Sequence, residues 1–308
     1  MKMRNITMCT LDIGLIIMCG TASSVLAGKE TMTESNAVPP YMIVMSDTHV
    51  SCPEGRWAKA TPHFKAFLSS LQADPPEILF INGDIVDNMV IENGKPVMGT
   101  VQHWEQDVAT YHAAIAPYKQ IAFRGSLGPN HDFYEVGNIP EALAGEKLCP
   151  QRGSFAWQGF DFVWLSSKIH AFSNEPSKRE ESFTPDDLQW LDRELAGKQR
   201  VVLFFHVPLR TAETAKRGPW PGNRNITTPP EDKIYSLIDR HLDKIELIFH
   251  GHIHQAMETD YKGIPIRLTP FWGQGHYSKV SVDGDVLRVE QHTFRRSPLC
   301  LVCLGVSP

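Results

Sequence analysis

From Tyr41 onward, short apolar runs alternate with polar segments of helical character. The runs are rich in β-branched and aromatic residues and have the length of buried strands. They lie at 41–46, 77–82, 119–123, 160–166, 201–205 and 246–249. Helices are predicted between them, over 61–72, 100–116, 184–195 and 231–242. Beyond residue 263 apolar and polar positions alternate, which predicts antiparallel strands. The pattern predicts one α/β domain over 41–296.

The first 27 residues differ from this pattern. Lys2 and Arg4 precede an apolar stretch that ends in small residues at Ala27. This order is typical of a cleavable signal peptide over 1–27 rather than of a membrane helix, so we expect export to a periplasm or to the medium. A lipoprotein anchored through Cys19 fits less well, because the bulky Met18 precedes that cysteine. We expect 28–40 to be an unstructured lead-in and 297–308 to be a tail.

Charge and cysteine content narrow the possible partners. The formal net charge is -5, from 30 Lys+Arg and 35 Asp+Glu, with no long basic run, which argues against nucleic acid as the main partner. Cleavage after Ala27 would leave four cysteines, and an exported protein can form disulfides, although the sequence does not give their pairing. These cysteines are Cys52, Cys149, Cys300 and Cys303.

Three histidines follow the last buried strand at alternate positions. If the chain is extended there, His250, His252 and His254 project to the same side. Neutral imidazole is the commonest metal ligand, and Gly251 would let the backbone approach a bound ion closely. No CxxC pair lies at zinc-finger spacing from these histidines, so other ligands must come from elsewhere in the chain.

Polar donors also follow the other predicted strands. The carboxyl ends of strands in an open α/β sheet share one edge, so donors far apart in sequence can converge there. Any one of them alone would fit a helix cap or a satisfied core histidine, but their recurrence at five strand ends favours a site. They are Asp47 and His49, Asp84, Asn130 with His131 and Asp132, His206, and the histidines after the last strand.

This combination of motifs resembles the calcineurin-like metallophosphoesterase superfamily. The motifs are Asp47-x-His49, Gly83-Asp84, Asn130-His131-Asp132, His206 and Gly251-His252-x-His254, in the order of the family and over residues 41 to about 277. The resemblance implies a four-layer αββα sandwich with a dinuclear metal site at the strand ends. It implies two metal ions, for which this donor set suits iron, zinc or manganese.

The resemblance also assigns ligands, with Asp84 bridging both ions. It gives one metal Asp47, His49, Asp84 and His254, and the other Asp84, Asn130, His206 and His252. His250 has no ligand role, so we expect it behind the ligands or facing solvent. The usual Gly-Asn-His motif is interrupted here, as if Ser126–Pro129 were inserted before Asn130. Since proline restricts the backbone, this loop either narrows the site or bulges outward.

The implied reaction is hydrolysis of a phosphate ester by a metal-bridging hydroxide. His131 would protonate or stabilise the leaving oxygen, and Asp132 would either orient His131 or serve as a turn residue. The expected substrates are mono- or diesters of small organic molecules, with nucleotides among the candidates. Two alternatives remain open at this point: a nuclease of the same superfamily, which the acidic charge disfavours, and a non-catalytic metal-binding scaffold, which the intact ligand set disfavours.

Overall fold

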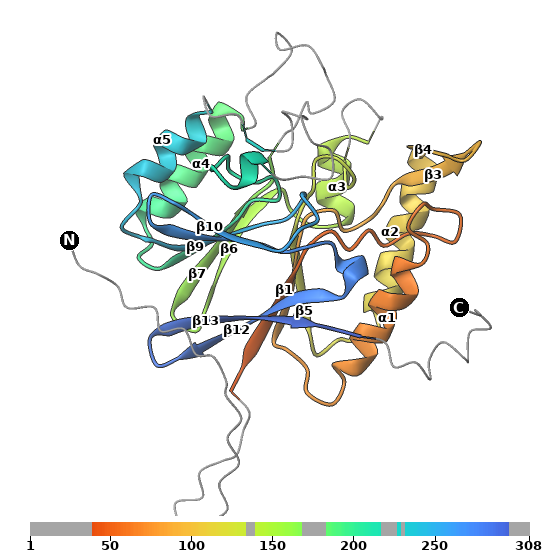
Figure 1. Ribbon diagram of the computed structural model, residues 1–308, viewed down its shortest axis with the longest axis horizontal. Helices are drawn as coiled ribbons and strands as arrows, with labels where there is room; N and C mark the ends of the chain where they lie inside the picture. Colours follow the sequence, from red (N-terminus) through yellow and green to blue (C-terminus); the bar gives the residue numbers. More distant parts are fainter. Residues whose placement is uncertain (1–38, 134–138, 168–182, 217–226, 229–231, 296–308) are drawn as a thin grey trace, which may run out of the picture. The chain divides into compact units, whose positions relative to one another are not determined.

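The computed structural model describes residues 39–133, 139–167, 183–216, 227–228 and 232–295 (Figure 1). The predicted signal peptide, the lead-in up to residue 38 and the predicted tail with Cys300 and Cys303 lie outside these residues. Cys52 and Cys149 are buried free thiols. Among the described residues, no helix is long and apolar enough to cross a membrane.

Two mixed sheets form the centre of the domain that begins at Pro39. In spatial order, the first contains β13 (Val286–Thr293), β12 (His276–Asp283), β1 (Tyr41–Met45), β2 (Ile78–Asn82) and β5 (Ala122–Ser126). The second contains β10 (Met257–Tyr261), β11 (Ile264–Leu268), β9 (Ile245–His250), β8 (Val201–Phe204), β7 (Phe160–Leu165) and β6 (Arg152–Trp157). Strands β1, β2 and β5 are parallel, as are β7, β8, β9 and β11. Each sheet therefore brings several carboxyl strand ends to one edge.

The two sheets pack face to face through an apolar layer. Val44 and Phe80 of the first sheet belong to the same core cluster as Phe204 and Phe249 of the second. The rings of Phe80 and Phe204 stack with centroids 4.1 Å apart. Full burial of side chains of this size stabilises a fold by about 1.5–3 kcal/mol each, so this layer is a main source of the contact between the sheets.

Helices cover the outer face of each sheet (Figure 1). Phe64 and Trp104, from α1 (Ala60–Ser70) and α2 (Val101–Ile115), pack in one core with residues of the first sheet. Leu191 and Leu237, from α4 (Pro185–Ala196) and α5 (Lys233–Arg240), pack with residues of the second. The expected αββα order of layers is confirmed.

The helix predicted at 184–195 begins where the sequence indicates. The Thr184 hydroxyl accepts the Asp187 amide at 3.1 Å, and the Asp187 carboxylate accepts the Thr184 amide at 3.2 Å. This reciprocal capping box satisfies two amides that have no partner within the helix, and Pro185 occupies the first turn, where no amide hydrogen is needed.

Several predicted elements differ from the structure. The strand predicted at 119–123 runs over Ala122–Ser126, because its polar end pairs with β2, with Ser126 opposite Asn82. The C-terminal strands are not all antiparallel, since β11 is parallel to β9. Helix α3 (Glu141–Lys147) and the hairpin of β3 (Met89–Glu92) and β4 (Lys95–Met98) were not predicted. The hairpin turn Asn93-Gly94, with φ of 51° and 75°, is a standard hairpin pair that the sequence did contain.

Candidate metal centre

The structure brings all seven predicted metal ligands to the carboxyl ends of strands from both sheets. Asp47 and His49 follow β1, Asp84 follows β2, and Asn130 follows β5. The remaining ligands follow strands of the second sheet, His206 after β8 and His252 with His254 after β9. The site therefore lies at the edge where the two sheets meet, as the sequence predicts.

The backbone turns sharply at these positions. Five of the seven predicted ligands have a positive φ, which is uncommon for residues other than glycine and is often found at functional sites. They are Asp47 at 54°, His49 at 42°, Asp84 at 51°, His252 at 69° and His254 at 59°. The strand ends at His250, and the segment after it is not extended. The condition under which the three histidines would share one face is therefore not met.

The second predicted ligand group has four side-chain atoms that are buried and lack a hydrogen-bond partner among the described residues. They are Asp84 Oδ1, Asn130 Oδ1, His206 Nε2 and His252 Nδ1. Asp84 Oδ2 lies 3.2 Å from both His206 Nε2 and Asn130 Nδ2. Since leaving buried polar atoms unpaired costs about 1–3 kcal/mol each, this donor set fits a bound cation better than a hydrogen-bonded core.

The other predicted metal has an equally compact donor set. His254 Nε2 lies 3.2 Å from Asp47 Oδ1 and 3.3 Å from His49 Nε2, and His49 Nε2 lies 3.9 Å from Asp84 Oδ2. One donor atom of each of these four residues lies within 4.8 Å of those of the other three, and Asp84, His206 and His252 form a second such group. Asp84 belongs to both groups, as a bridging ligand must.

Burial and charge oppose each other at the two aspartates. Burial works to raise the pKa of Asp47, but the His254 and His206 imidazoles outweigh it and lower that pKa. Burial likewise opposes ionisation of Asp84, yet His206 and His131 hold its pKa well below the ordinary value. Although burial lowers the pKa of His206, Asp84 and Asp47 raise it to about 9. Because a metal ligand must be a neutral imidazole, binding of a cation here would release a proton.

His250 is a buried structural residue. Its Nδ1 donates to the carbonyl oxygen of Phe205 at 2.9 Å, and its Nε2 accepts the Leu209 amide at 3.3 Å. Both ring nitrogens are therefore occupied by the segment that follows β8. Burial lowers the pKa of His250 to about 4, which keeps the ring neutral and suits this pair of contacts. The expected absence of a ligand role agrees with this geometry, while the solvent-facing alternative does not.

Asp87, rather than Asp132, contacts the predicted acid His131. His131 Nδ1 lies 2.5 Å from the Asp87 carbonyl oxygen and 3.5 Å from its carboxylate, and that carboxylate also lies 3.4 Å from His49 Nδ1. Arg56 holds the Asp87 carboxylate at 2.8 Å. Of the two roles expected for Asp132, the structure supports the turn residue and not the orientation of His131, because both carboxylate oxygens accept backbone amides, from Val86 at 3.0 Å and Gly128 at 2.7 Å.

The loop that interrupts the Asn-His motif folds inward. Leu127 lies in the core of the first sheet, and its amide donates to Ser166 Oγ at 2.9 Å. A Cβ on Gly128 would lie 2.0 Å from Asp84 Oδ1, so only glycine allows this approach. The loop therefore packs against the bridging aspartate instead of bulging outward, and it places Asn130 beside Asp84.

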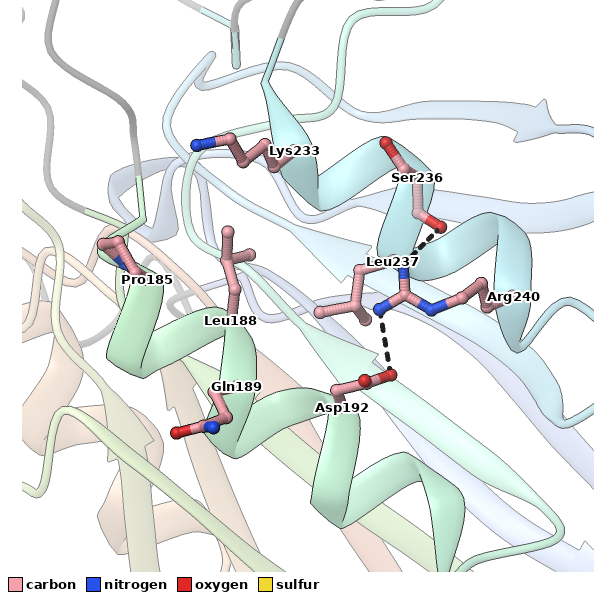
Figure 2. Close-up of a pocket in the computed structure, with 8 residues that line it drawn as sticks. All are labelled: Pro185, Leu188, Gln189, Asp192, Lys233, Ser236, Leu237 and Arg240. Atoms are coloured by element: carbon pink, nitrogen blue, oxygen red, sulfur yellow. Dashed lines mark hydrogen bonds and ion pairs between the residues drawn. The ribbon is translucent and has the colours of Figure 1, made fainter.

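A separate hollow of about 460 Å³ lies between α4 and α5 (Figure 2). Arg240 from α5 pairs with Asp192 from α4 at 3.1 Å inside it, and His241 also pairs with Asp192. None of its lining residues belongs to the predicted metal groups, so we do not assign the chemistry to this hollow. Its lining residues are Pro185, Leu188, Gln189, Asp192, Lys233, Ser236, Leu237 and Arg240.

Sequence reasoning missed three residues at the centre. Asp87 lies three positions after Asp84, and Asn82 is a polar residue that ends an apolar run; both signals were available in the sequence. Trp57 gave no such signal, because it lies in a loop far from any motif. In the structure its ring lies 6.2 Å from that of His49.

The bridging position of Asp84 predicts a graded loss of metal. Compared with the unaltered protein, Asp84→Asn is expected to lose about two ions per chain and His254→Ala about one, because only Asp84 belongs to both ligand groups. Metal content of purified protein measures this, with His112→Ala on the exposed side of α2 as the unaffected control. Near-complete occupancy in Asp84→Asn would remove Asp84 from the bridging role.

Comparison with known proteins agrees with this geometry. The family model described as calcineurin-like phosphoesterase matches residues 41–256. Metallophosphoesterase 1 of Cricetulus griseus is 26% identical over 235 residues, which cover 65% of this chain and 55% of that protein. The chain thus spans little more than half the length of that relative.

Two solved structures share the fold at low sequence identity. A dimetal phosphatase from Danio rerio has a TM-score of 0.60 and 13% identity, covering 83% of this chain and 97% of the other. A putative 5'-nucleotidase from Staphylococcus aureus, in complex with alpha-ketoglutarate, has a TM-score of 0.52 and 14% identity. The match covers 85% of this chain and 55% of the other. The family match extends over most of the domain and contains all seven predicted ligands. The chain belongs to the calcineurin-like phosphoesterase family.

Proposed function

We propose that the chain is an exported, two-metal phosphoesterase that hydrolyses mono- or diesters of small organic phosphates, with nucleotides among the candidates. The observation that carries this proposal is the pair of buried donor groups that share Asp84. A scaffold without bound metal would leave their unpaired buried atoms unsatisfied, at a cost in stability. Two bound cations would activate water, orient the phosphate and neutralise its charge.

In this proposal His131 acts on the leaving oxygen. Its Nδ1 faces the Asp87 carbonyl oxygen, so the proton of the neutral ring lies on Nδ1 and Nε2 is the nitrogen left for a substrate. Burial lowers the pKa of His131 to about 4. A phosphate ester beside it would raise that pKa again, because opposite charges favour the protonated ring. In this proposal substrate binding prepares the general acid.

Two aromatic rings beside the first ligand group favour an organic substrate. Phe271 stacks on His254 with ring centroids 5.1 Å apart, and Trp57 lies 4.8 Å from Phe271. Trp57 is partly exposed, so this wall offers an apolar surface on which the organic part of an ester can rest. Arg56 lies 5.1 Å from the Trp57 ring and supplies a cation at the same place.

The ester preference is tested with purified protein reconstituted with manganese, zinc or iron. We expect hydrolysis of nitrophenyl phosphate, its diester or nucleoside monophosphates, and little cleavage of DNA, because the chain is acidic overall and has no long basic run. Asp84→Asn protein, prepared in the same way, controls for contaminating phosphatases. Faster turnover of DNA than of small esters would favour the nuclease, and metal-loaded protein inactive on every ester would favour the scaffold.

The role of His131 is tested within one variant. His131→Ala should keep its metals and lose about a hundredfold or more in turnover of an alkyl phosphate, because a poor leaving group needs a proton. Nitrophenyl phosphate should suffer less, since its phenolate leaves unaided. His112→Ala serves as the control. Equal losses on both esters at full metal content would contradict the acid role and favour an electrostatic one, whereas loss of metal would place His131 among the ligands.

Export is part of the proposal and rests on the apolar leader with Lys2 and Arg4 before it. Intact-mass analysis of the protein recovered outside the cytoplasm should give a chain that begins at Gly28 or within a few residues of it. A cytoplasmic protein that retains Met1 would contradict both the cleavage and the export.

A further inference from the structure

A second cluster of metal-binding side chains lies against α2 and shares no ligand with the metal centre. It consists of Cys52, which follows β1, and of His103 and Asp107 from α2. All three are buried. Because His103 and Asp107 are four residues apart on a helix, they lie on the same face, the one that packs against the segment containing Cys52.

The spacing of the donor atoms matches a small cation. Cys52 Sγ lies 3.7 Å from His103 Nδ1, and His103 Nε2 lies 3.5 Å from Asp107 Oδ2. For tetrahedral zinc, standard bond lengths place sulfur and nitrogen ligands about 3.6 Å apart and nitrogen and oxygen ligands about 3.4 Å apart. The two measured separations run to different nitrogens of His103, so an ion bound through one nitrogen would require the ring to move; one donor atom from each residue already lies within 4.8 Å of the other two.

Two buried side chains at this cluster have polar atoms without a hydrogen-bond partner among the described residues. These are His103, at Nε2, and Asn88, at both Oδ1 and Nδ2. The Asn88 amide donates to Asp107 Oδ2 at 2.9 Å, which ties Asn88 to the cluster. A Cβ on Gly99 would lie 2.9 Å from Asn88 Oδ1 and 2.6 Å from the His103 ring, so both side chains approach the same glycine. The unpaired amide oxygen of Asn88 is therefore the candidate for a fourth donor.

The hydrogen bonds within this cluster do not satisfy all of its buried polar atoms. Asp107 accepts the amides of Cys52 at 2.7 Å and of Asn88, and these contacts leave His103 Nε2 and both polar atoms of the Asn88 side chain without partners among the described residues. A divalent ion would pair with His103 Nε2 and Asn88 Oδ1 and displace the thiol proton of Cys52 to solvent.

We propose that Cys52, His103 and Asp107, with Asn88 Oδ1, bind a third metal ion, zinc or another divalent cation that prefers thiolate. Four protein ligands leave no open position, which is the arrangement of structural rather than catalytic zinc sites. The ion would tie the segment after β1, which carries His49, and the segment after β2, which carries Asp84, to helix α2.

Metal counting tests this site directly. Protein stripped of metal, reloaded with zinc under reducing conditions and freed of excess is expected to hold three ions per chain, about one of which is lost in Cys52→Ser. Cys149→Ser is the matched control, because Cys149 is also a buried free thiol but belongs to no donor group. It should keep three ions. Two ions per chain in the unaltered protein would overturn the proposal, whatever the variants do.

A spectrum identifies the ligand independently of activity. The predicted catalytic ligands are nitrogen and oxygen donors only, so a thiolate-to-cobalt absorption band in cobalt-loaded protein must come from a cysteine. We expect this band in the unaltered protein and in Cys149→Ser, and its loss in Cys52→Ser. A band that persists in Cys52→Ser would assign it to another cysteine and overturn the proposal, as would its absence from the unaltered protein. Both outcomes are read from the spectrum alone and require no measurement of ester hydrolysis at the other site.

Discussion

The side-chain amide of Asn82 joins the two sheets at the edge where the site lies. Its Nδ2 donates to the carbonyl oxygens of Phe205 at 3.4 Å and Phe249 at 3.3 Å, both in the second sheet's strand ends, while its Oδ1 accepts Ser126 Oγ at 2.8 Å. Its own carbonyl oxygen accepts His206 Nδ1 at 2.6 Å. One buried residue thus links the ends of β2, β5, β8 and β9, and its contact with His206 Nδ1 leaves His206 Nε2 facing Asp84. Because each unpaired buried group costs about 1–3 kcal/mol, this arrangement has little freedom to slip.

The loops after β1 and β9 approach each other closely at the site. A Cβ on Gly251 would lie 1.9 Å from Ser46 Oγ and 2.8 Å from Asp47 Oδ2, so the loops after β1 and β9 meet only because this residue is glycine. The His252 amide then donates to both carboxylate oxygens of Asp47 at 3.1 Å. Five of the seven predicted ligands in these crowded loops have a left-handed backbone. Such backbone strain persists only where the surrounding structure holds the residue in place.

The apolar runs predicted which polar residues would gather at one edge, because each predicted ligand follows a strand, whereas their assignment to two metals came from the family resemblance. Contacts made through side chains of neighbouring loops leave no such pattern. Asp132 follows His131 directly, which suggested a pair, yet the chain turns so that its carboxylate holds the amides of Gly128 and Val86. His250 shows the same limit, because an alternating pattern cannot reveal that the strand ends there and the next residues adopt positive φ.

The segment after β2 connects the two clusters. The Asp87 carboxylate lies between the rings of His49 and His131, while the amide of the next residue, Asn88, donates to Asp107 on α2. Asn88 also has a positive φ, 50°, so a single strained turn separates the two contacts. Any shift of α2 against the first sheet would therefore move Asp87 and both imidazoles together. An ion held by Cys52, His103 and Asp107 would keep α2 in place, which makes the position of His131 depend on residues that never touch the substrate.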